Sequence, residues 1–179
     1  MGIFNKILRD AKPMSDFEKS NYCKELSLAG RDEEAYRVFS EIKPTASSST
    51  YYYAMNFLVT SLLRLKRYDD CIREISESEE RFPMTAYLKY IQGICYSALG
   101  RNSDAKECWL CAMTIPEDPT TLFIQNTGYT DYFPMLRLAE LAAMERDSGK
   151  ASEYVERAAA LYPEHHAWRD TRITVLLLT

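Results

Sequence analysis

The chain has 179 residues, of which 46% are hydrophobic and 27% are charged, and its formal net charge is −4. This composition excludes an intrinsically disordered chain, and the length corresponds to one domain with its own hydrophobic core. The 22 basic residues are outnumbered by 26 acidic ones. Because no basic surplus is available to hold a phosphate backbone, we expect no nucleic-acid partner.

The cysteines and the hydrophobic runs indicate the compartment. The chain has five scattered cysteines. A secreted disulfide scaffold uses cysteines in pairs, so an odd number argues against that class. Asn5, Lys6 and Arg9 interrupt the apolar residues at the start of the chain, so the segment differs from a signal peptide. No apolar run approaches the ~20 residues that span a bilayer. We therefore expect a cytoplasmic protein with no membrane insertion.

Taken in chain order, the first predicted element is a short amphipathic cap over residues 1–14, where Ile3, Phe4, Ile7 and Leu8 follow helical spacing. Helices are then predicted at about 16–29, 51–65, 85–99 and 132–146. Ser15 and Glu18 form a capping box at the start of the first of these helices.

A second series of helices is predicted from a recurring pattern of a polar stretch, a small residue and a large apolar residue four positions later. The small residues are Ala35, Cys71, Ala105 and Ala151, which are 36, 34 and 46 positions apart. A small residue there lets two antiparallel helices approach closely. A proline that stops the helix follows each time, at Pro44, Pro83, Pro116 and Pro163.

This pattern resembles the tetratricopeptide repeat, a helix pair with a period of about 34 residues. The resemblance implies an all-α fold, an α-solenoid of about four helix-turn-helix repeats. It places the repeats at about 15–44, 50–83, 84–116 and 131–163 of a domain spanning 15–163. The interval of 46 contains an inserted loop at 117–130. Residues 164–179 are predicted to form a C-terminal capping helix.

Two groups of residues were weighed as chemical sites. Cys108 and Cys111 form a CxxC, but they lie in a predicted helix with no second pair, so we expect core thiols rather than a zinc or redox site. His165 and His166 are adjacent and point about 100° apart on a helix, which does not suit one metal. We expect a non-enzymatic protein with no catalytic, cofactor or metal site.

In such solenoids the first helix of each pair lines the concave face. Carried onto this chain, the resemblance gives these candidate peptide-binding residues: Lys24, Tyr53, Asn56, Thr60, Tyr87, Tyr90, Ile94, Phe133, Leu136 and Glu140. Tyr53, Tyr87 and Tyr90 are the expected central contacts, because tyrosine gives large contact area at low entropic cost. Lys24 and Glu140 are expected to set orientation. The alternative is that Tyr87 and Tyr90 pack between neighbouring helices.

These features predict a protein–protein interaction scaffold or adaptor that binds a peptide or helix of a partner in an aromatic groove. The alternatives are a regulatory or docking domain of a larger enzyme, and a bacterial secretion-type chaperone. The loop between 115 and 130 is either an extra helical turn or a flap over the groove.

The last predicted helix raises the question of self-association. Trp168, Val175 and Leu178 share one helix face by spacing. We expect this apolar face to form a homodimer, the alternative being that it folds back on the chain as an ordinary cap.

Overall fold

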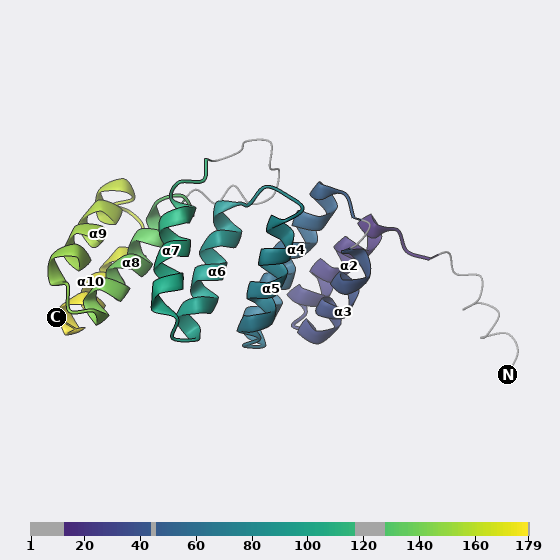
Figure 1. Cartoon of the computed structure of the whole chain (residues 1–179), viewed down its shortest axis with the longest axis horizontal. Helices are drawn as coiled ribbons and strands as arrows, with labels where there is room; N and C mark the ends of the chain where they lie inside the picture. The colour runs from purple at the N-terminus through teal and green to yellow at the C-terminus, as the bar shows by residue number, and fades with distance from the viewer. Residues whose placement is uncertain (1–12, 44–45, 117–127, 179) are drawn as a thin grey trace, which may run out of the picture. The chain divides into compact units, whose positions relative to one another are not determined.

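The computed structural model describes residues 13–43, 46–116 and 128–178, and all regular secondary structure within these ranges is helical (Figure 1). This confirms the all-α class. The helices are α2 (Asp16–Leu28), α3 (Asp32–Ile42), α4 (Ser48–Arg64), α5 (Tyr68–Glu79), α6 (Ala86–Ala98), α7 (Asn102–Ala112), α8 (Tyr132–Met144), α9 (Ser148–Leu161) and α10 (Ala167–Leu178). The predicted cap before residue 13, Pro44 and most of the loop 117–130 lie outside the described residues.

The four helices predicted first correspond to α2, α4, α6 and α8. Side chains that accept hydrogen bonds from the first turn explain where three of them begin, namely Ser15, Ser47 and Thr85. At Ser15 the capping box is complete, because the Ser15 backbone N–H donates to the Glu18 carboxylate at 2.8 Å. These starts are therefore set by local sequence.

The turns after α2, α4, α6 and α8 repeat one backbone geometry. Each contains a residue with positive φ, namely Gly30 at 72°, Lys66 at 56°, Gly100 at 73° and Arg146 at 66°. The next residue has φ between −85° and −94° in all four turns and carries an i,i+3 ion pair: Arg31–Glu34, Arg67–Asp70, Arg101–Asp104 and Asp147–Lys150. A left-handed residue ends a helix because it redirects the chain. The recurrence has the same spacing as the small residues.

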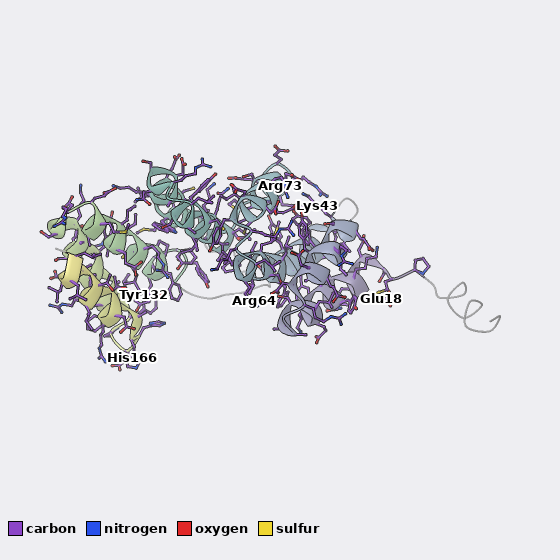
Figure 2. All side chains as sticks on the ribbon, turned by 90° about the horizontal axis from the view of Figure 1, so that it is seen from below. Glu18, Lys43, Arg64, Arg73, Tyr132 and His166 are labelled. Carbon is purple, nitrogen blue, oxygen red and sulfur yellow. The ribbon has the colours of Figure 1, made fainter. Side chains whose placement is uncertain are left out.

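The chain divides into two compact units, residues 1–65 and 66–179, which are described separately. In the first unit α2, α3 and α4 pack on one another, and Phe39 and Leu58 are fully buried between them. Arg64 joins all three helices near their ends (Figure 2). Its guanidinium donates to the Asp32 carboxylate at 3.0 Å and to the Ser27 hydroxyl at 3.0 Å.

In the second unit α6 and α7 run antiparallel and side by side (Figure 1). Their contact depends on Gly93, because a Cβ atom there would lie 2.4 Å from Nε1 of Trp109. The Trp109 side chain is buried, and its Nε1 donates to the backbone carbonyl of Tyr90 at 3.3 Å. The Trp109 ring of α7 therefore packs directly against the backbone of α6 at Gly93.

The last three helices pack through small residues, which permit short interhelical distances. The cluster consists of Ala139, Ala142, Ala143, Ala151, Val155 and Val175. Val175 is thus buried, and Trp168 packs against the cluster around Tyr132. The face predicted to be exposed therefore turns inward at these two positions. The apolar residues of α10 that remain most exposed are Ile173, Leu176 and Leu177.

Among the described residues, no helix has the length and apolar character needed to cross a membrane.

We expect Gly93→Ala to destabilise the second unit by about 1–3 kcal/mol, because the added methyl group overpacks the Trp109 ring. Gly149→Ala is the matched control. It lies in helix α9, where an added Cβ meets only Asp147 Oδ1 at an ordinary 3.7 Å, and alanine favours helix. The free energy of unfolding of both variants is measured by urea unfolding followed by circular dichroism. Equal stability of the two variants would contradict the close contact.

The Asp32–Arg64 pair predicts that the stability of the first unit depends on pH. The hydrogen bond from Arg64 lowers the pKa of the buried Asp32 carboxyl below its usual value. The pair therefore stabilises the fold fully above pH ~4 and loses its effect as the pH falls through the lowered pKa. Asp32→Asn should cost about 1–3 kcal/mol at pH 7, and the difference from wild type should narrow in acid. The exposed Glu34 provides the control Glu34→Gln, which should change stability little.

Candidate functional site

A pocket of about 330 Å³ lies in the second unit, between α6, α8 and α10. Its lining residues are Tyr90 from α6, Tyr129 from the segment before α8, Phe133, Leu136, Arg137 and Glu140 from α8, and Ala167, Asp170 and Thr171 from α10. The α8 residues follow the pattern i, i+3, i+4, i+7 and the α10 residues the pattern i, i+3, i+4, so each set occupies one face of its helix. The pocket is therefore built from one face of α8, one face of α10, Tyr90 of α6 and Tyr129 of the segment before α8.

Aromatic rings form one wall of this pocket. The Tyr129 ring centroid lies 5.1 Å from that of Tyr90 and 5.0 Å from that of Phe133. Behind it, the Tyr87 ring lies 4.9 Å from Tyr129 in an edge-to-face arrangement. Such separations are those of favourable aromatic pairs. Tyr129 thus joins the aromatic residues of α6 to those of α8.

The charge of Arg137 is held in place by two neighbours. Its Nε donates to the Tyr90 hydroxyl at 3.3 Å, and its Nη1 donates to the Glu140 carboxylate at 2.7 Å. Burial alone lowers the pKa of the Arg137 guanidinium, but the Tyr90 and Glu140 oxygens raise it above the ordinary value. Arg137 is therefore a permanent cation whose hydrogen bonds fix the pocket rim.

Asp170 stands across the pocket on α10, and its side chain is exposed. Among the described residues, no lysine, arginine or histidine nitrogen lies within 4.0 Å of its carboxylate. The two other ionised side chains of the lining, Arg137 and Glu140, pair with each other. Asp170 is therefore the one charged residue of the lining that has no ion pair within the described residues.

The position of the α10 wall depends on Tyr132, which is fully buried at the start of α8 (Figure 2). Its hydroxyl accepts a hydrogen bond from the backbone N–H of Trp168 at 3.1 Å and lies 2.9 Å from Nδ1 of His165. These contacts fix the first turn of α10, and with it Ala167 and Asp170, against α8.

The structure brings together part of the predicted binding set. Tyr90, Phe133, Leu136 and Glu140 line the pocket, and Tyr87 contacts it through Tyr129. Tyr90 was expected either to contact a ligand or to pack between helices. It is 8% exposed and also borders the pocket, so it does some of each. Ile94, also on α6, is half-buried and is not among the lining residues.

The remaining predicted residues belong to the first unit. Lys24 lies on α2, and Tyr53, Asn56 and Thr60 lie on α4. All four are half-buried. The Tyr53 ring packs edge-on against Phe57 at 5.4 Å, and the Thr60 hydroxyl donates to the backbone carbonyl of Asn56.

Five lining residues are absent from the predicted binding set, namely Tyr129, Arg137, Ala167, Asp170 and Thr171. Arg137 follows Leu136 on the same helix face, so helical spacing around the chosen residues could have found it. The α10 residues share a comparable signal, with spacings of three and four, but the predicted helix was assigned a capping role. Tyr129 lies in the segment 115–130, which was predicted to be either an extra helical turn or a flap and of which the structure describes 115–116 and 128–130.

Three cysteines of this unit, Cys71, Cys95 and Cys108, are buried, and Cys111 is half-buried. Cys108 is buried, and burial raises the pKa of its thiol to about 11. Its Sγ contacts the side-chain oxygen of Gln92 at 3.6 Å. Within the described ranges no group of three His, Cys, Asp or Glu side chains has the arrangement of a metal site. Cys108 is thus a protonated core residue at neutral pH.

Comparisons with known proteins give no assignment. No protein-family model matches the chain, and searches of curated proteins and of solved structures find no significant match. Function is therefore inferred from the geometry of the pocket.

Proposed function

We propose that the protein is a tetratricopeptide-like repeat scaffold or adaptor that binds a peptide or helix of a partner protein in the pocket of the second unit. The repeat class is supported by the four turns of one geometry, which recur at the intervals of the small residues. Chains of similar helix pairs commonly use one face to bind other proteins.

The binding role is supported by one observation above the others, the half-exposed aromatic wall of Tyr129 and Phe133 beside a fixed polar rim. Aromatic side chains dominate the energetics of protein interfaces, because they bury much apolar area at low entropic cost. The pocket volume of about 330 Å³ is at the lower end for ligand sites. That size suits an anchoring side chain of a partner segment.

The pocket predicts a loss of partner binding in the double variant Tyr129→Ala and Phe133→Ala. Affinity capture from the native cell, quantified by mass spectrometry, should lose specific proteins retained by the wild type. We expect the loss to exceed tenfold, since truncation of central aromatic residues commonly costs 2 kcal/mol or more.

The control for this experiment is Leu110→Ala, which removes an exposed apolar side chain from α7 outside the pocket. Circular dichroism should give the wild-type helical content for both proteins. If the double variant captures the same proteins as the wild type, the pocket is not the binding site.

We also propose that the outer face of α10 mediates self-association, in place of the face predicted from spacing. Ile173 is 57% exposed, Leu176 70% and Leu177 81%. Exposed apolar patches of this kind are commonly covered by another protein, and a two-fold dimer buries the same patch on both chains.

Sedimentation of the full chain over a range of concentrations tests this proposal. We expect wild type to dimerise and the variant Leu176→Glu, Leu177→Glu to remain monomeric, because burying the new carboxylates is unfavourable. Leu110→Glu places the same charge on an exposed leucine of α7 and should dimerise like wild type. A wild type that stays monomeric at high concentration would refute self-association.

A further inference from the structure

The charges around the pocket are unequal. Arg137 already has its hydrogen bonds to Glu140 and Tyr90, so its charge is compensated within the wall. Asp170 has no cation within ion-pairing distance among the residues that the structure describes. A ligand group entering the pocket therefore meets the Asp170 carboxylate, which has no ion pair, and the Arg137 guanidinium, which is already paired with Glu140.

The aromatic wall also favours a positively charged group in the ligand. The faces of Tyr and Phe rings carry negative electrostatic potential and attract Lys and Arg head groups. Tyr90, Tyr129 and Phe133 all border the pocket. Leu136 and Ala167 line it as well, and such surface suits the methylene stem of a long basic side chain, which prefers apolar contact below its charged end.

An acidic side chain fits this site poorly. It would approach the carboxylates of Asp170 and Glu140. It would also have to displace Glu140 from Arg137, a contact of 2.7 Å. The net charge of the chain, −4, adds to the repulsion of acidic segments and favours the approach of basic ones.

We propose that the pocket selects a lysine or arginine side chain of the partner segment, with its stem on the aromatic wall and its charged end at Asp170. This inference rests on the proposed function, because it assumes that the pocket receives a segment of a partner protein. Asp170 is then the residue that sets specificity, and Tyr129 and Phe133 supply most of the contact area.

Position-scanning pools of short end-capped peptides test the selection on the purified full chain. One central position is fixed as arginine, lysine, citrulline, norleucine or glutamate, and the other positions are randomised. Citrulline has the shape of arginine without its charge, and norleucine provides a neutral match for lysine. Binding is measured by fluorescence anisotropy at low and at high salt.

We expect the arginine and lysine pools to bind wild type about fivefold tighter than their neutral counterparts, as for a partly exposed charge pair with an aromatic contribution. High salt should reduce this preference. Asp170→Asn should abolish it. Glu156→Gln should retain it, because that variant removes an exposed carboxylate of α9 outside the pocket.

The outcomes separate this inference from the proposed function. Equal binding of the charged and neutral pools, if that binding is lost in the Tyr129→Ala, Phe133→Ala variant, overturns the basic specificity and supports the binding pocket. Preference for the glutamate pool overturns the basic specificity as well. If no pool binds in a manner that depends on Tyr129 and Phe133, both the inference and the proposed function are wrong.

Discussion

The packing of α6 against α7 in the second unit depends on the absence of a side chain at Gly93. Because α6 presents bare backbone there, the Trp109 indole lies against it and donates its N–H to the carbonyl of Tyr90. That hydrogen bond fixes the turn of α6 that carries Tyr90. The Tyr90 side chain borders the pocket, and its hydroxyl accepts a hydrogen bond from Arg137. Core packing between α6 and α7 is thus connected, through one residue, to the geometry of the candidate site.

Elsewhere, partly buried polar contacts connect helices whose apolar contacts alone would let them slide past one another. The Arg64 guanidinium joins α2, α3 and α4 of the first unit through Ser27 and Asp32. In the second unit the Tyr132 hydroxyl connects α8 to the first turn of α10. Hydrogen bonds are directional, so such contacts select one register among several that bury similar apolar area.

The helices and their pairing were predictable because their signals are local. The capping residue Ser15 and small residues such as Ala105 act within a helix or between neighbours in sequence. The site was predictable at Tyr90 of α6 and along α8, where one helix face supplies several lining residues. The contributions of Tyr129 and Asp170 depend on tertiary placement. Which face of α10 is buried was left open by the sequence, because the helix is apolar on both sides and spacing identified the Val175 face without indicating that it is buried.

The packing of α10 has a consequence for its dynamics. This helix packs on α8 and α9, and one of its faces forms a wall of the pocket. Any molecule held between the walls therefore adds contacts that are lost when α10 detaches. Through thermodynamic linkage, occupancy of the pocket raises the free energy of that local opening. The backbone amides of α10 would then exchange their hydrogens with solvent more slowly in the complex than in the free chain.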